Sequence, residues 1–176
     1  MTYKLLPYIS ETEIEMIVST IAYEIDHSLR NDSADLVLLI VLKGGFMFGA
    51  DLSRKIKHKH SVEFIRLSSY GMNGTQQKER VAITPIGKFD FEGKNVVIVE
   101  DMIDKGKSTD ALRKYMSAYN PKSVKVCAFT VRDGYPVGGV DYYGRIANSE
   151  KWLAGYGLDL SEEFRHIPYV AEIVFE

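Results

Sequence analysis

The chain has 176 residues, of which 45% are hydrophobic and 26% are charged, and its formal net charge at pH 7 is −2. These values are typical of one globular domain with a sizeable core, and the charge offers no electrostatic footprint for nucleic acid. No apolar run is long enough to suggest a membrane span. The single cysteine, Cys127, lies in an apolar stretch and suggests a reducing compartment. From the charge, the hydropathy and the cysteine together, we expect a cytoplasmic protein with no nucleic-acid or membrane partner.

The amino-terminal third predicts an arm, two helices and a buried strand. Residues 1–10 are expected to form an irregular arm. A capping-box pattern of serine and glutamate then opens a helix over about residues 10–30. The continuous apolar run 36–42 predicts a buried strand, and a helix follows over about residues 46–57.

The rest of the chain alternates strands with helices and loops. Strands are predicted at 61–67, 81–85, 95–99 and 123–131, and a helix at about 107–119. Residues 68–80 are polar and contain two glycines, so a surface hairpin is the simplest interpretation of that stretch. The order of elements predicts an α/β fold with a mostly parallel, twisted sheet flanked by helices.

The most informative stretch is the turn after the apolar strand 95–99. It combines acids, a glycine, a lysine and hydroxyls, namely Glu100, Asp101, Asp104, Gly106, Lys107, Ser108 and Thr109. Free N–H groups at a helix start suit a phosphate monoester. The acids before them can accept hydrogen bonds from sugar hydroxyls or reach a hydrated Mg²⁺. A ribose 5-phosphate would satisfy both halves.

Two other interpretations of this turn are weaker. Residues 106–109 look like the second half of a nucleoside triphosphatase P-loop, but that motif needs a glycine five residues before Gly106. This chain has Asp101 there, and its charge would repel a triphosphate. An ordinary solvated turn is disfavoured by the three acids that lie within five residues directly after a buried strand.

Residues 97–108, with the sequence V-I-V-E-D-M-I-D-K-G-K-S, resemble the signature of the type I phosphoribosyltransferases. The resemblance implies one domain over residues 1–176, with a small hood from about 1–10 and 132–176. It also implies that 5-phosphoribosyl-1-pyrophosphate is the donor, with Mg²⁺ as cofactor, and that the protein is a homodimer or homotetramer.

The same resemblance implies roles for the residues of the turn. Asp104 would be the catalytic base, and Glu100 and Asp101 would hold the ribose hydroxyls and the metal. The 5-phosphate would be cradled by Lys105, Gly106, Lys107, Ser108 and Thr109. Lys105 stands where the family usually has threonine, so either a cation lies beside the 5-phosphate or only the backbone N–H is used there.

Further segments resemble the pyrophosphate site and the mobile loop of the family. Lys43 and Gly44 begin a glycine turn after the strand 36–42, and the resemblance implies a cis peptide bond between residues 42 and 43. Arg66 and Arg165 would also face the pyrophosphate. Ser69 and Tyr70 resemble the start of a lid, about residues 69–80, which would keep water from a ribosyl transition state.

The last segment resembles the 6-oxopurine branch, the hypoxanthine-guanine phosphoribosyltransferases. The match is W-L-A-G-Y-G-L-D at residues 152–159. Trp152 would stack on the purine, Leu153 and Asp159 would meet its other edge, and Asp159 could hold a second Mg²⁺. Arg132 stands where the branch has a lysine that donates to O6 of the base, and the stretch before Trp152 is longer than usual.

These residues predict transfer of a phosphoribosyl group to hypoxanthine or guanine, a purine-salvage reaction. Arg132 keeps open an enzyme for xanthine or another base. A non-enzymatic sensor of nucleotides with the same fold is a further alternative. Such a sensor would not need to retain Asp104, the lid and Trp152 together.

Overall fold

The computed structural model describes residues 2–70, 80–148 and 150–176. The first half contains β1 (Tyr3–Ile9), α1 (Glu11–Leu29), β2 (Leu36–Leu42), α2 (Phe46–Lys55), β3 (His60–Tyr70) and β4 (Arg80–Ile86). The second half contains β5 (Asn95–Ile103), α3 (Lys107–Met116), β6 (Ser123–Arg132), β7 (Tyr142–Ala147), β8 (Trp152–Ala154) and β9 (Val170–Phe175). No helix in these ranges is both long and apolar enough to cross a membrane.

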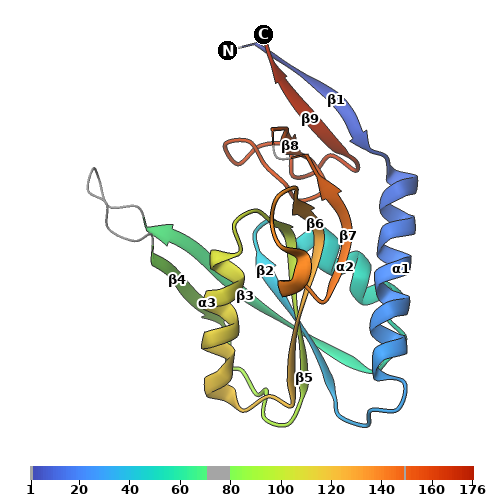
Figure 1. The fold of residues 1–176 in the computed structure, drawn as a ribbon, viewed down its shortest axis with the longest axis vertical. Coiled ribbons are helices and arrows are strands. Elements are labelled where there is room, and N and C mark those ends of the chain that lie inside the picture. Colours follow the sequence, from blue (N-terminus) through green and yellow to red (C-terminus); the bar gives the residue numbers. More distant parts are fainter. Residues whose placement is uncertain (1, 71–79, 149) are drawn as a thin grey trace.

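A six-stranded sheet with the order β4-β3-β2-β5-β6-β7 forms the centre of the molecule. Its neighbouring strands are parallel except for β3 and β4, which are antiparallel. Helices α1 and α3 flank the sheet on opposite sides (Figure 1). The predicted α/β class with a mostly parallel sheet is therefore confirmed.

Alternation along the buried strands builds two cores, one on each face of the sheet. In β2, Leu36, Leu38 and Ile40 join the core that contains α1 and α2 residues. The intervening residues of the same strand join the core under α3. Because both faces of the sheet are covered at β2, every residue of this strand is apolar. The predicted capping box of α1 is also present, with Ser10 and Glu13 bonded reciprocally.

A second sheet, with the order β1-β9-β8, forms the hood beside both chain termini (Figure 1). The expectation of an irregular arm at residues 1–10 is wrong, because Tyr3–Ile9 pairs antiparallel with the strand Val170–Phe175. That partner lies at the other end of the sequence, where local patterns give no sign of it. The hood also begins later than expected after residue 132, since β7 is an edge strand of the large sheet.

Two other strands are longer than the sequence predicted. β5 continues through Glu100 and Asp101 to Ile103, so these two acids lie on a strand and the turn is only residues 104–106. Its partner β6 extends it, with Ile103 opposite Val131. β3 likewise runs through Tyr70, so Ser69 and Tyr70 are strand residues. The remainder of the predicted lid, residues 71–79, lies outside the described residues.

Candidate active site

The predicted site residues come together because four parallel strands end at the same edge of the large sheet. β2 pairs in parallel with both β3 and β5, and β5 pairs in parallel with β6. Arg66, which is exposed, lies opposite Leu42 in the register of β2 and β3. Ligands of open α/β sheets bind at this edge, beyond the carboxyl ends of the strands.

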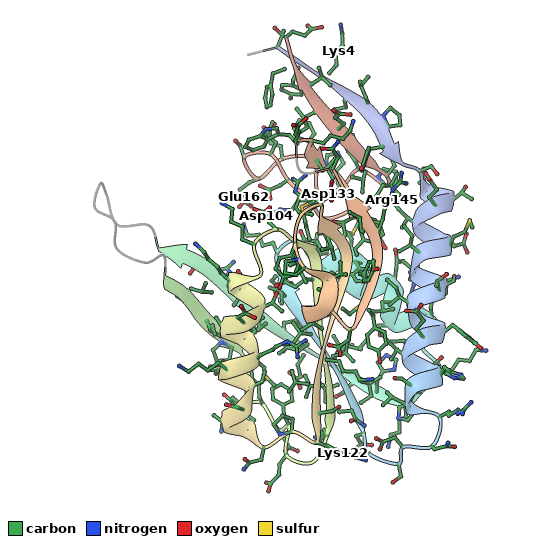
Figure 2. All side chains as sticks on the ribbon, in the orientation of Figure 1. Lys4, Asp104, Lys122, Asp133, Arg145 and Glu162 are labelled. Atoms are coloured by element: carbon green, nitrogen blue, oxygen red, sulfur yellow. The ribbon has the colours of Figure 1, made fainter. Side chains whose placement is uncertain are left out.

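A cavity of about 350 Å³ follows the end of β5. Its lining consists of Val41, Leu67, Val81, Glu100, Met102, Ile103, Asp104, Lys105, Gly106, Lys107, Ser108 and Thr109. It thus contains every predicted ribose and 5-phosphate residue except Asp101. Asp104 is exposed to solvent there, and Figure 2 shows it at the amino-terminal end of α3.

The amino terminus of α3 provides the anion-binding end of this cavity. Gly106 is the N-cap residue, with φ 70° and ψ −5°, and its position has no side-chain cap. The left-handed backbone favours glycine, and a Cβ there would lie 2.3 Å from Oη of Tyr135. The packing of Tyr135 against the turn, which the sequence did not indicate, therefore helps to fix the end predicted to bind the phosphate.

A close backbone approach joins the loop after β2 to the carboxy-terminal part of the chain. A Cβ on Gly44 would lie 1.7 Å from Oδ2 of Asp101, and a Cβ on Gly157 would lie 2.1 Å from the carbonyl oxygen of Gly44. Gly157 also has φ 97°. The peptide bond between Leu42 and Lys43 is cis, as the resemblance implied. A side chain at Gly157 would clash with the backbone of Gly44, and one at Gly44 would displace the carboxylate of Asp101.

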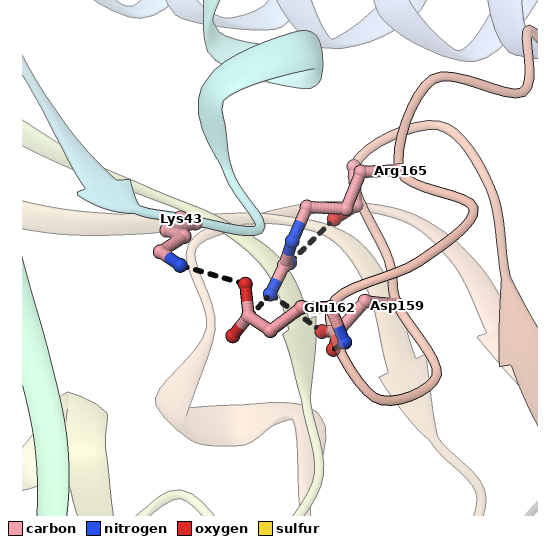
Figure 3. A network of polar contacts seen from close by, with 5 residues as sticks. Lys43, Asp159, Glu162 and Arg165 are labelled. Carbon is pink, nitrogen blue, oxygen red and sulfur yellow. Dashed lines mark hydrogen bonds and ion pairs between the residues drawn. The ribbon is translucent and has the colours of Figure 1, made fainter.

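Charged side chains gather over this contact (Figure 3). Arg165 Nη2 lies 2.7 Å from Asp159 Oδ1 and 3.4 Å from Glu162 Oε1, and Lys43 Nζ lies 2.6 Å from Glu162 Oε2. Arg165 Nη1 donates to the carbonyl of Gly157 at 2.8 Å. Nε of Arg165 is buried and has no hydrogen-bond partner within the described residues. Two of the three predicted pyrophosphate cations, Lys43 and Arg165, thus share the carboxylate of Glu162.

Two neighbouring acids, the buried Glu100 and the half-buried Asp101, dominate the electrostatics of the site. Burial raises the pKa of Glu100 well above its usual value, and the neighbouring charge of Asp101 raises it further. Burial also raises the pKa of Asp101, while backbone N–H groups and the charge of Arg165 oppose that shift. At the rim, a hydrogen bond from Lys43 lowers the pKa of Glu162. The site therefore disfavours the charged form of its two central acids.

The acids fit a magnesium ion that is held partly by a substrate. The charge of Asp159 raises the pKa of Asp101, so these carboxylates interact. Within the described ranges, no group of three or more His, Cys, Asp or Glu side chains is arranged to hold a metal. Mg²⁺ usually keeps several waters and is bound through one or two carboxylates plus substrate phosphates, which suits this pair.

The residues predicted to meet the base lie where β6 approaches the hood. Trp152 is 63% exposed and does not pack in the core. Leu153 is buried in the core and offers only its backbone. Arg132 Nη1 donates to the carbonyls of Asn148 and Lys151, at 2.8 Å and 2.6 Å.

Comparisons with known proteins agree with this geometry. Residues 9–159 match the model of the phosphoribosyl transferase domain. The chain belongs to the phosphoribosyltransferase family. It is 32% identical to hypoxanthine phosphoribosyltransferase of Escherichia coli, over 94% of this chain and 93% of the relative. It is 34% identical to hypoxanthine-guanine phosphoribosyltransferase of Aquifex aeolicus, over 95% and 93%.

Solved structures of the family have the same fold. A crystal structure of a hypoxanthine-guanine phosphoribosyltransferase from Bacillus anthracis superposes with a TM-score of 0.86 at 29% identity, covering 98% of this chain and all of that one. The hypoxanthine phosphoribosyltransferase of Trypanosoma cruzi gives a TM-score of 0.84 at 27% identity, covering 97% of each chain. The resemblance to the 6-oxopurine branch is thereby confirmed.

The buried acids generate a prediction about stability. Because the pKa of Glu100 is raised in the folded protein, the folded state holds a proton that the unfolded chain has lost, and stability falls as the pH rises through that interval. Glu100→Gln should therefore raise the free energy of unfolding near pH 7.5 by about 0.5–2 kcal/mol. Below about pH 4 the gain should disappear, because the carboxyl is then protonated in both states.

Urea unfolding curves at several pH values measure this effect. Glu92→Gln is the matched control, since Glu92 is exposed and its substitution should leave the pH dependence unchanged. Equal stability of the Glu100 variant and the unmodified protein near pH 7.5 would show that burial of this carboxylate has no cost.

Proposed function

We propose that the protein transfers the 5-phosphoribosyl group from phosphoribosyl pyrophosphate to N9 of hypoxanthine or guanine. The products are IMP or GMP and pyrophosphate, so the reaction belongs to purine salvage. One observation carries the proposal: the start of α3 and the Gly44 turn follow the carboxyl ends of the neighbouring strands β5 and β2, and Arg132 at the end of β6 is bonded to the segment before the exposed Trp152. The names of the relatives support it.

The cavity at the end of β5 is proposed to hold the phosphoribosyl group. Backbone N–H groups at the start of α3 would bind the 5-phosphate, together with Lys105, Gly106, Lys107, Ser108 and Thr109. Lys105 is exposed at the rim of this cavity, which keeps a direct contact of its ammonium group available. Glu100 and Asp101 would accept hydrogen bonds from the ribose hydroxyls.

Pyrophosphate is proposed to bind beside the Gly44–Gly157 contact. Lys43, Gly44, Arg66 and Arg165 would receive it, and the buried, unpartnered Nε of Arg165 offers a donor for a phosphate oxygen. Glu100 and Asp101 would hold one Mg²⁺ and Asp159 could hold a second, and the charge of the metal would offset that of the pyrophosphate.

The base is proposed to lie on Trp152, with its six-membered ring between Arg132 and the backbone of Leu153 and Asp159. N9 would form the new bond to C1 of the ribose while the bond from C1 to the pyrophosphate oxygen breaks with its electron pair. Asp104 would take the proton from N7. Its exposed position in the cavity at the end of β5 supports this role. Arg132 is the observation that favours xanthine as the second candidate base.

The proposal extends to the domain organisation, the lid, the oligomeric state and the location of the protein. The hood residues Ile9, Leu153 and Val170 share a core with α1 and β2, which supports a single domain over the whole chain. The lid role of Ser69 and Tyr70 stays a prediction. So do the homodimer or homotetramer and a cytoplasmic location, which the phosphorylated donor favours.

A turnover assay tests the function. The purified protein, Mg²⁺ and phosphoribosyl pyrophosphate are mixed separately with hypoxanthine, guanine, xanthine and adenine, and pyrophosphate release is followed. We expect turnover with hypoxanthine or guanine. Turnover only with xanthine or adenine would overturn the base assignment, and binding of the donor without turnover would favour the sensor.

Asp104→Asn tests the proton transfer. Turnover should fall by about 10²–10⁴-fold, the usual contribution of a general base, because the amide cannot accept the N7 proton. Binding of phosphoribosyl pyrophosphate, measured by calorimetry, should change little. Asp110→Asn, in the exposed first turn of α3, is the control with normal turnover. Unchanged turnover in the Asp104 variant would remove this residue from the mechanism.

Glu162→Gln tests whether pyrophosphate competes with an internal anion. Glu162 pairs with Lys43 and Arg165, so pyrophosphate must take its place between them. Loss of an exposed ion pair of about 0.2–1 kcal/mol should tighten pyrophosphate binding about 1.4- to fivefold. Product-inhibition constants measure this change, with Glu163→Gln as the control. Weaker binding in the Glu162 variant would mean that this carboxylate organises the site instead.

A further inference from the structure

Arg132 is bonded to the segment that leads into Trp152. It is the last residue of β6 in the large sheet, whereas Trp152 begins β8 in the hood. Nη1 of Arg132 donates to the carbonyl oxygen of Asn148 at 2.8 Å and to that of Lys151 at 2.6 Å. The second carbonyl belongs to the peptide group whose nitrogen is that of Trp152. The guanidinium therefore holds the backbone directly before the proposed base platform.

The Trp152 side chain depends on its backbone for its position. The indole is 63% exposed, and its ring contact is an edge-on approach to Phe175 with centroids 6.4 Å apart. β8 has three residues and pairs with β9. The preceding segment is held to the hood by an ion pair between Lys151 and Glu172. Arg132 adds a link from this segment to the carboxyl end of the large sheet.

We propose that Arg132 is a positioning residue that fixes Trp152 over the phosphoribosyl site. The inference rests on the proposed function for its purpose, although the contacts do not depend on it. One guanidinium can serve both the loop and the base, because the two carbonyls engage only Nη1. Nη2 and Nε carry the remaining N–H groups of the planar fork, and these can face the oxygen at C6 of a purine.

A lysine at this position could not do the same work. Its ammonium nitrogen lies one bond closer to the backbone than Nη1, and it lacks the rigid fork that directs two donors to two carbonyls while others point elsewhere. An ammonium that reaches the base would leave the Lys151 carbonyl without this partner. The arginine thus couples recognition of the base to the position of the ring on which the base stacks.

Arg132→Lys tests the proposal with two readouts. Trp152 is the only tryptophan of the chain, so fluorescence excited at the long-wavelength edge, where tyrosine absorbs little, reports on this residue alone. In the ligand-free variant, we expect lower steady-state anisotropy and stronger iodide quenching of Trp152. The KM for hypoxanthine should rise about tenfold, the effect of losing one hydrogen bond to a charged group, while the KM for phosphoribosyl pyrophosphate should stay within about twofold.

Two further variants complete the design. Arg132→Gln removes the charge and both bonds, and it should show the same changes at larger size. Arg113→Lys is the matched control, because Arg113 Nη2 also donates to a backbone carbonyl, that of Gly139 at 2.9 Å, in a segment that does not lead into Trp152. It should leave both Trp152 readouts and both KM values unchanged. Urea unfolding confirms that each protein is folded under the assay conditions.

The outcomes separate the positioning role from the proposed function. A rise in the hypoxanthine KM with unaltered anisotropy and quenching would mean that Arg132 acts only on the base, and the proposal would be overturned. Unchanged values in all readouts would overturn it as well. If the unmodified protein turns over no base, the proposed function fails, yet the fluorescence of the ligand-free variants still decides whether Arg132 holds Trp152.

Discussion

The site depends on the close approach of the backbones at Gly44 and Gly157. The carbonyl of Gly44 occupies the space where a Cβ on Gly157 would lie, and the carboxylate of Asp101 occupies the corresponding space at Gly44. The backbones at Gly44 and Gly157 therefore touch without an intervening side chain, and the carboxylate of Asp101 packs directly against Gly44. This contact brings the cations Lys43 and Arg165 to the same edge of the sheet as α3. A side chain at Gly157 would move the two backbones apart, whereas one at Gly44 would displace the Asp101 carboxylate.

The acids that would bind the ligand at this edge reduce the stability of the fold. Glu100 is buried and its neighbour Asp101 is half-buried, and burial raises the pKa of both. A charged carboxylate in such a place costs free energy unless a cation compensates it. Arg165 opposes the shift at Asp101, but its own Nε has no partner within the described residues. Acids with raised pKa values beside a donor of this kind are the pattern expected of a site that a charged ligand completes.

Local patterns in the sequence predicted the elements that are governed by nearest neighbours. The continuous apolar run of β2 reflects burial on both faces of the sheet, and the reciprocal bonds of Ser10 and Glu13 reflect a local cap. The phosphate-binding start of α3 was also recognisable, because it combines a strand, a glycine and a helix start within a few residues. The grouping of the predicted ribose and phosphate residues around one cavity follows from these local features.

Long-range contacts account for what the sequence did not reveal. β1 is a strand only because the far end of the chain supplies β9, and β5 extends past Asp101 because β6 pairs with it. The packing of Tyr135 on Gly106 and the ion pair of Lys43 with Glu162 likewise join distant residues. Arg132 stood out as a departure from the family pattern, but its bonds to Asn148 and Lys151 could be seen only in the structure.

The central claim is that one ligand spans the amino terminus of α3 and the ring of Trp152. The most direct measurement is a titration with IMP that follows the fluorescence of this single tryptophan, with calorimetry in parallel. The account predicts a saturable change at one IMP per chain, and competition by ribose 5-phosphate, which itself leaves the fluorescence unaltered. Binding of IMP by calorimetry without a change at Trp152, or without competition by ribose 5-phosphate, would contradict the account.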